Sequence, residues 1–255
     1  MTLFELDSYF RSFLKPEAFP GDPSQNGIQV QNDNPKNTAV EKVAFAVDAC
    51  LDTILQTAQA QAQVLVVHHG LFWGHEQCLV GYHYERIHAL LKHNIALYAC
   101  HIPLDANEDV GNNYGLAKQL GLTALSPFGN WHGMNIGVKG ILPESLSIHD
   151  LATKAFPDEQ KSITLLDFGK KKIQSVAIVS GGAGDMAEQA ISEECDAFIT
   201  GEIAHEQYHT ALENKINIIA GGHYRSETVG VSLLAKKLQH EKKIQTIFID
   251  SPTGL

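Results

Sequence analysis

Two adjacent histidines, His68 and His69, follow a short apolar run at residues 64–67. A continuous valine-rich run of this length is typical of a parallel strand buried on both faces, and Gly70 allows the chain to leave it sharply. Open α/β sheets bind ligands at the carboxyl ends of such strands. Because successive side chains of an extended chain point in opposite directions, the two imidazoles could reach two centres a few ångströms apart. This geometry predicts a pair of metal ions.

One histidine pair among 13 histidines is weak evidence, because a histidine at a strand end is commonly a hydrogen-bonded core or surface residue. A metal site needs further histidines and carboxylates from other parts of the chain. His223 and Glu227 meet this need: four residues apart at the start of a predicted helix, they project from one face, just after an apolar run at 216–220. The same spacing occurs in exposed pairs that only stabilise a helix, so both interpretations stay open.

His101 and Asp105 follow another apolar run, at residues 95–100. Asp105 could bind a metal, or it could cap a helix or form a turn with the residues after it. His101 could be a ligand, an orienting residue, a general acid/base or a structural histidine. If sequential strands are neighbours, both residues follow the strand beside the one that ends in His68 and His69.

Two glycine-containing segments also follow predicted strands. Residues 180–184, Ser-Gly-Gly-Ala-Gly, precede a helix, which is the context of a phosphate-binding turn. They lack the lysine of a Walker A motif and the third spaced glycine of a dinucleotide-binding motif, so they indicate a tight turn that could contact an anion. Residues 201–206 form a second polar cluster, for which the sequence suggests no mechanism.

The elements that must position these residues alternate between strand and helix. Apolar spacing predicts a helix at 3–14, and an irregular stretch follows at 16–37, with a turn and short strand at 26–30. Apolar runs then predict strands at 43–47, 64–67 and 95–100, with helices at 49–62, 81–94 and 112–119. This order predicts a mostly parallel sheet with right-handed crossovers.

The second half repeats this pattern without a residue-level repeat. We expect strands at 135–141, 163–168, 176–179, 197–200, 216–220 and 246–249, and helices at 148–156, 186–195, 202–214 and from 223 to about 240. The predicted fold class is α/β, with two linked three-layer α/β domains and mostly parallel sheets. Residues 1–125 and 222–255 form the predicted metal-ligand-bearing domain, residues 126–221 form the second, and the segment up to residue 130 is the boundary.

The composition is that of a globular protein without broad affinity for polyanions. The 255 residues carry a formal charge of −10, which argues against binding of nucleic acid or an anionic membrane. No apolar run approaches the ~20 residues of a membrane helix, and no charged-then-apolar leader begins the chain, so we expect a cytoplasmic protein. The four cysteines are widely separated and form no C-x-x-C pair, which indicates buried thiols and no cysteine-based zinc site.

Six segments, taken together and in order, resemble the dinuclear-metal toroidal hexamer family, whose YbgI-like members are commonly labelled GTP cyclohydrolase 1 type 2 homologs. The segments are Asn26 to Val30, His68 to Gly70, His101 to Asp105, Ser180 to Gly184, Thr200 to Glu202 and Gly222 to Glu227. The resemblance covers essentially the whole chain. The sequence lacks the Cys/His/Cys arrangement of true GTP cyclohydrolase I, so it does not support the activity in that label.

The resemblance implies two divalent metal ions per subunit. In that family, the residues equivalent to His69 and Asp105 bind one ion, those equivalent to His68 and His223 bind the other, and the equivalent of Glu227 bridges them. It also implies two α/β domains and a homohexameric ring whose metal sites face an internal cavity.

Histidine and carboxylate ligands suit Zn, Mn or Fe better than Ca or Mg, and so few protein ligands leave coordination positions open. We therefore expect a metal-dependent hydrolase acting on a phosphorylated or nucleotide-like small molecule, with His101 as the acid/base group. Two dications against two carboxylates leave a charge of about +2, which favours an anionic ligand or substrate. The alternatives are a metallochaperone that carries the ions as cargo, and a ring-shaped interaction scaffold without catalysis.

Overall fold

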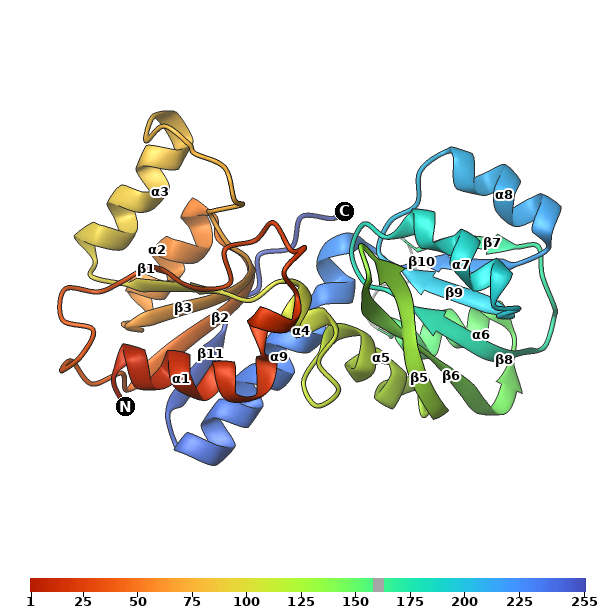
Figure 1. The fold of residues 1–255 in the computed structure, drawn as a ribbon, viewed down its shortest axis with the longest axis horizontal. Helices are drawn as coiled ribbons and strands as arrows, with labels where there is room; N and C mark the ends of the chain where they lie inside the picture. Colours follow the sequence, from red (N-terminus) through yellow and green to blue (C-terminus); the bar gives the residue numbers. More distant parts are fainter. Residues whose placement is uncertain (158–162) are drawn as a thin grey trace. The chain divides into compact units, whose positions relative to one another are not determined.

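The computed structural model describes residues 1–157 and 163–255. It divides into two compact units: Met1–Leu104 with Val231–Ser251 form unit 1, and Asp105–Gly230 with Pro252–Leu255 form unit 2 (Figure 1). These bounds differ from the predicted division at 125/126 and 221/222, and that domain assignment stays a prediction. The chain passes between the units in two helices, α4 (Ile102–Asp105) and α9 (His223–Lys242), and again after Ser251.

The sheet of unit 1 is mostly parallel, as the sequence predicts. Its strand order is β1-β4-β3-β2-β11, in which β1 runs antiparallel to β4 and the other neighbours are parallel. Val67 of β3 pairs with Ala99 of β4, so both strands end at the same edge. The strands are β1 (Gly27–Val30), β2 (Lys42–Asp48), β3 (Val64–His69), β4 (Ala96–Ala99) and β11 (Gln245–Phe248).

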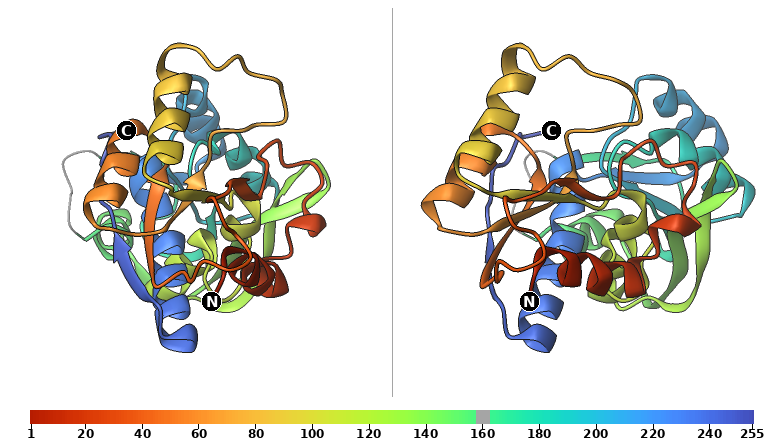
Figure 2. Two further views of the ribbon diagram at one scale, coloured as in Figure 1. Left: turned by 90° about the vertical axis from the view of Figure 1, so that its left-hand side faces the viewer. Right: turned by 60° about the vertical axis from the view of Figure 1, so that its left-hand side comes forward.

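Helices cover both faces of this sheet. Figures 1 and 2 show α2 (Leu51–Gln59) and α3 (Gly81–Lys92) on one face and α1 (Leu3–Leu14) on the other. Helix α1 occupies the predicted residues because Thr2 and Glu5 form a capping box at its start, and its apolar stripe is buried. A 3-10 turn, η1 (Pro16–Ala18), begins the long loop that leads to β1.

Unit 2 holds a mixed sheet with the order β5-β6-β8-β9-β10-β7. Strands β8, β9 and β10 are parallel, but β5, β6 and β7 join through antiparallel pairings, so this sheet is more antiparallel than the sequence predicts. The difference arises because an apolar run marks a buried strand without giving its direction. The strands are β5 (Thr123–Trp131), β6 (Met134–Leu146), β7 (Thr164–Asp167), β8 (Ile173–Ile178), β9 (Ala197–Thr200) and β10 (Asn217–Ala220).

The helices of unit 2 lie close to their predicted positions. One core packs two of these helices against β6, β8, β9 and β10. It contains Leu120 of α5, Leu151 of α6 and Phe156, which follows α6 directly. Helix α8 begins later than predicted, so residues 201–205 form the loop before it. The helices are α5 (Asn112–Leu120), α6 (Ile148–Ala155), η2 (Gly184–Met186), α7 (Ala187–Ser192), α8 (Glu206–Asn214) and the start of α9.

The segment after Gly121, through residue 130, was predicted as a domain boundary. It instead forms strand β5, which pairs antiparallel with β6. Pro127 and Gly129 favour turns and therefore conceal the strand in the sequence. Strand β5 tolerates them because it lies at the edge of its sheet. A two-residue turn, His132 and Gly133, joins β5 to β6, with both residues at positive φ.

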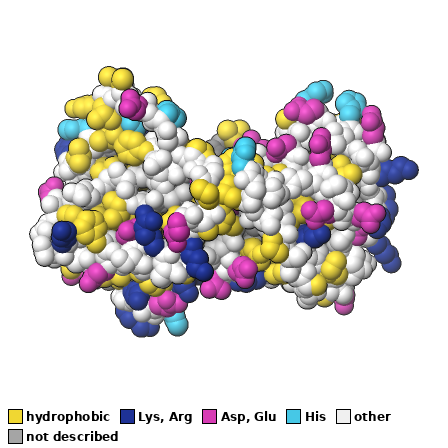
Figure 3. Space-filling model, in the orientation of Figure 1, with side chains coloured by type: hydrophobic (Ala, Val, Ile, Leu, Met, Phe, Trp, Pro, Cys, Tyr) yellow, Lys and Arg dark blue, Asp and Glu magenta, His cyan; other side chains and the backbone are white. Residues whose placement is uncertain are grey.

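Among the described residues, no helix is both long and apolar enough to cross a membrane. Figure 3 shows acidic and basic side chains interspersed over one face of the protein, with hydrophobic side chains gathered over α3. The exposed large hydrophobic residues of α3 and the segment before it are Leu79, Val80, Tyr82, Tyr84 and Leu91.

Candidate metal centre

Three histidines gather at the carboxyl edge of the sheet in unit 1. His68 and His69 are the last residues of β3, and His101 follows the end of β4. Their ring centroids lie 4.7 Å (His68 to His69), 5.0 Å (His68 to His101) and 5.6 Å (His69 to His101) apart. Each side chain offers a ring nitrogen, and these nitrogens lie within 4.8 Å of one another. The structure thus brings together three of the predicted site residues.

The alternation of side chains along β3 does not separate His68 from His69. His68 is fully buried and His69 is partly exposed, yet their ring centroids are only 4.7 Å apart. The two imidazoles therefore border one small volume, where their nitrogens can serve a single ion or two adjacent ions.

All three rings make the outer hydrogen bond that metal-binding histidines usually make. In each ring, Nδ1 faces a carbonyl or carboxylate oxygen, so Nδ1 carries the proton and Nε2 carries the lone pair. The acceptors are the Cys100 carbonyl oxygen for His68 (3.0 Å), Asp48 Oδ1 for His69 (2.8 Å) and Asp22 Oδ1 for His101 (2.9 Å). This geometry fits histidines that bind a cation through Nε2.

An aromatic side chain borders these histidines. The Trp73 ring lies edge-on to His101 at 5.0 Å between centroids, and 6.1 Å from the ring of His69. Its indole N–H donates to the Gly70 carbonyl oxygen at 3.1 Å, which fixes the ring next to the exit of β3. An indole ring therefore borders the histidine cluster.

In unit 2, His223 and Glu227 lie in the first two turns of α9. His223 Nε2 is 3.2 Å from Glu227 Oε1, and His223 Nδ1 is 2.6 Å from Glu202 Oε1. The hydrogen bond to Glu227, together with the one to Glu202, raises the pKa of His223 to about 9, although burial opposes the shift. The two carboxylates thus favour positive charge at this imidazole, and a metal cation is the other form in which that charge can be supplied.

Asp105 has a fixed carboxylate. The side chain is buried, and Oδ1 accepts hydrogen bonds from Asn112 Nδ2 at 2.8 Å and from the Ser180 hydroxyl at 2.9 Å. It does not cap the following helix, because α5 begins at Asn112 with Gly111 in the N-cap position. The capping alternative is therefore wrong, and the orientation of this carboxylate fits a ligand.

The glycine turn at 180–184 packs against Glu227, the carboxylate of the His223 and Glu227 pair. Gly181 has a φ of +69°, and a side chain there would collide with the Glu227 carboxylate and lie 3.3 Å from His223 Nε2. Gly181 N donates to the Ser226 hydroxyl at 3.0 Å, which ties the turn to the start of α9. The structure therefore gives this turn a packing role beside Glu227, and the anion contact suggested by its sequence stays a prediction.

Sequence reasoning missed the three carboxylates that orient histidines: Asp22, Asp48 and Glu202. Asp48 could have been identified from the sequence, because it is the last residue of β2 and pairs directly with His69 of the neighbouring strand. Glu202 lies in the polar cluster after β9 for which the sequence suggested no mechanism, and the structure assigns it to His223. Asp22 comes from the irregular loop at 16–37, where no periodic pattern points to it.

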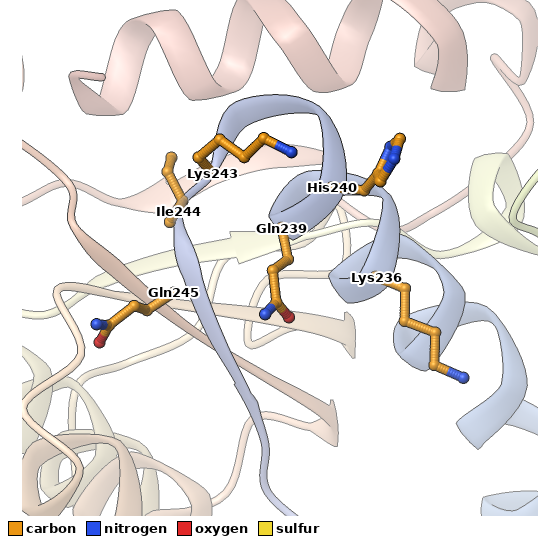
Figure 4. Close-up of a pocket in the computed structure, with 6 residues that line it drawn as sticks. All are labelled: Lys236, Gln239, His240, Lys243, Ile244 and Gln245. Carbon is orange, nitrogen blue, oxygen red and sulfur yellow. The ribbon is translucent and has the colours of Figure 1, made fainter.

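A separate pocket lies at the opposite edge of the sheet in unit 1, where α9 ends and β11 begins (Figure 4). Lys236, His240 and Lys243 supply its basic groups, and Gln239 accepts a hydrogen bond from the Thr246 hydroxyl at 3.0 Å. The pocket holds no carboxylate among its lining residues, so it does not resemble the histidine cluster.

Comparisons with known proteins agree with the resemblance seen in the sequence. A model of the Duf34/NIF3 (NGG1p interacting factor 3) family matches residues 1–254. A GTP cyclohydrolase 1 type 2 homolog from Treponema pallidum (strain Nichols) is 45% identical over 289 aligned residues, covering 100% of both chains. One from Pyrococcus abyssi is 43% identical over 255 residues, covering 98% of both chains.

Solved structures show the same relationship. TTHA1606 from Thermus thermophilus has a TM-score of 0.90 and 34% identity, and protein ybgI, described as of unknown function, has a TM-score of 0.90 and 29% identity. Both matches cover 100% of each chain. With a family model that spans all but the last residue, the chain belongs to the Duf34/NIF3 family.

Proposed function

We propose that this protein is a metal-dependent hydrolase with two divalent ions per subunit, acting on a phosphorylated or nucleotide-like small molecule. The observation that carries the proposal is shared by four histidines: each holds Nδ1 on a carbonyl or carboxylate oxygen. Surface histidines rarely need such partners, whereas metal-binding histidines almost always have them. The proposed metal ligands are His68, His69, Asp105, His223 and Glu227.

The donor set points to Zn, Mn or Fe as the ions. Imidazole suits these metals, whereas Ca and Mg prefer ligands that are all oxygen. Bound at this site, such ions would supply Lewis acidity toward a substrate oxygen and an activated water. The protein residues would hold the ions and leave coordination positions open. Asp105 and Glu227 bring a charge of about −2, so two dications would leave a net charge of about +2, which would favour an anionic substrate.

Two neighbouring side chains support the substrate class and the reaction type. His101 has its Nδ1 fixed by Asp22, so Nε2 is the atom that can exchange a proton with a substrate or water. Trp73 beside it offers an aromatic surface on which a nucleobase could stack. His101 is therefore our candidate acid/base residue, and Trp73 is our reason for keeping nucleotides among the candidate substrates.

We also propose that the protein assembles into a homohexameric ring, because the family resemblance implies one. The name of its relatives refers to a GTP cyclohydrolase homolog, and no residue pattern in this chain supports that reaction. Light scattering at micromolar concentration tests the assembly, and a monomeric mass of about 28 kDa would exclude it. A cytoplasmic location stays a prediction.

The first experiment is metal analysis of protein purified without chelator or affinity metal. The same metal is then loaded into the protein for a screen of phosphomonoesters, phosphodiesters and nucleotides, with E227Q and H101Q as comparison variants. We expect two ions per chain, turnover that E227Q loses, and a kcat that H101Q lowers by about 100-fold or more without abolishing it. Weak, exchangeable metal without turnover would instead support a metallochaperone, and normal cellular function of metal-free variants would support a scaffold.

A further inference from the structure

Asp22 lies in the loop between α1 and β1, and only 1% of its side chain is exposed. Its carboxylate accepts four hydrogen bonds. Oδ1 accepts from Ser24 N and His101 Nδ1, both at 2.9 Å, and Oδ2 accepts from Asn26 Nδ2 at 2.8 Å and Ile102 N at 3.1 Å. All four neighbours act as donors, which is the environment that suits an ionised carboxylate.

These bonds join the loop to the end of β4. Asn26 adds another, because its Oδ1 accepts from His101 N at 2.8 Å. Burial would raise the pKa of Asp22, but the hydrogen bonds from His101, Asn26 and Ser24 outweigh it and hold the pKa below its usual value. The loop therefore holds both the backbone and the ring of His101.

We propose that Asp22 is a positioning residue for His101: it fixes the ring orientation and the tautomer with the proton on Nδ1, so that Nε2 carries the lone pair. The part that rests on the proposed function is the role of Nε2, which is to accept a proton during hydrolysis. Asp48 contacts His69 in the same way, but 34% of its side chain is exposed and His69 is the partner it holds. Water can replace Asp48 at His69, whereas the enclosed Asp22 has no such substitute.

The variant D22N tests this assignment because an amide cannot accept from four donors. Its nitrogen must face either His101 and Ser24 N, or Asn26 and Ile102 N. A backbone N–H cannot become an acceptor, and Asn26 is held by its bond to His101 N. The imidazole alone can move its proton to Nε2 and accept at Nδ1. We therefore expect the amide nitrogen to face His101 and the tautomer to switch.

The readout is the nitrogen spectrum of metal-free protein labelled with ¹⁵N at histidine, recorded by solid-state NMR. The signals missing from H101Q identify His101. In the wild type, we expect a protonated Nδ1 and an unprotonated Nε2 at this residue, and D22N should reverse them. D48N is the matched control, which should leave the His101 signals unchanged. A wild-type His101 with its proton on Nε2 would overturn the proposal, and this result does not depend on whether D22N folds.

Turnover and metal content separate a positioning role from a merely structural one. With bis(p-nitrophenyl) phosphate as the probe and Mn²⁺ loaded, we expect D22N to lower kcat by about 100-fold, the lower end for loss of acid/base catalysis, with metal content unchanged. The double variant D22N/H101Q should be no slower than H101Q, because Asp22 acts through His101. A further loss in the double variant would overturn the proposal. Absence of turnover in the wild type would instead count against the proposed function, while the tautomer result would stand.

Discussion

Replacing Gly181 with alanine should damage the candidate metal centre through two separate effects. The first is backbone strain, because a residue with a Cβ at a φ of +69° costs about 1–2 kcal/mol relative to glycine. The second is displacement of Glu227, because the new methyl group would occupy the position of its carboxylate. Glu227 would then lose its 3.2 Å contact with His223, which is worth about 1.5–3 kcal/mol for a charged hydrogen bond.

Gly133 provides the matched control for this prediction. It has a φ of +83°, but no atom lies within 4 Å of an added Cβ, so G133A introduces the strain without the collision. We expect G133A to lower the free energy of unfolding by about 1–2 kcal/mol. G181A should lower it by roughly 2.5–5 kcal/mol, the sum of both effects.

Two measurements test the prediction: urea unfolding at pH 7, and the metal affinity of each folded variant. G181A should bind Mn²⁺ or Zn²⁺ at least tenfold more weakly than wild type, since about 1.4 kcal/mol of lost interaction suffices, whereas G133A should bind normally. If the two variants matched each other in both stability and metal affinity, Glu227 would be free to move and the glycine turn would have no role in the site.

Three further predictions concern the ligands and the stability of unit 2. H68A and H69A should each retain roughly one of two ions per chain, since each loses one ligand of about three, and anomalous diffraction at the metal edge would contradict this if both variants lost the same ion. E227Q should lose both ions together, because it removes the charge that separates two dications, and retention of wild-type metal content after dialysis would exclude a bridging role. D196N should lower the free energy of unfolding by about 2 kcal/mol at pH 7, since buried Asp196 accepts from Gln174 N and Ser175 N. Burial raises the pKa of Asp196, but the hydrogen bonds from Lys170 and from these amides outweigh burial, so the folded pKa lies below its usual value. The stabilisation is therefore complete above the unfolded pKa of about 3.9 and is lost as pH falls through the lower folded pKa. If the difference in stability between wild type and D196N did not shrink at pH 2–3, this explanation would be refuted.

The sequence predicted the strands and helices of this protein well where burial alone determines them. The apolar runs that became β3 and β9 contain no turn-forming residue, and the structure buries nearly every position in them. Strand direction was not predictable in the same way: the apolar run of β8 lies between antiparallel β6 and parallel β9, and nothing in the run distinguishes the two neighbours. The His132 and Gly133 pair was the available signal for an antiparallel hairpin, since both residues accept positive φ.

The candidate site divides in a similar way. The strand-end histidines could be selected from the sequence because strand ends are where ligands bind, and the full ligand set came from the family resemblance. The orienting carboxylates depend on contacts across 21 residues for His69 and Asp48, and across 79 residues for His101 and Asp22. The first contact follows from strand pairing, but the second depends on how an irregular loop closes, which no local pattern encodes.

Each unit orients its own proposed metal ligands with hydrogen bonds made inside that unit. In unit 1, three imidazoles are oriented by acceptors from the same unit, and none of the proposed ligand carboxylates belongs to it. In unit 2, Ser180 and Asn112 orient Asp105, and the glycine turn packs against Glu227, so this unit supplies the ligand carboxylates. Imidazoles favour Zn and its neighbours, whereas carboxylates also accept harder ions such as Mn. The choice of metal should therefore respond differently to substitutions in the two units: loss of a unit 1 histidine should shift preference toward Mn, and loss of Asp105 should shift it toward Zn.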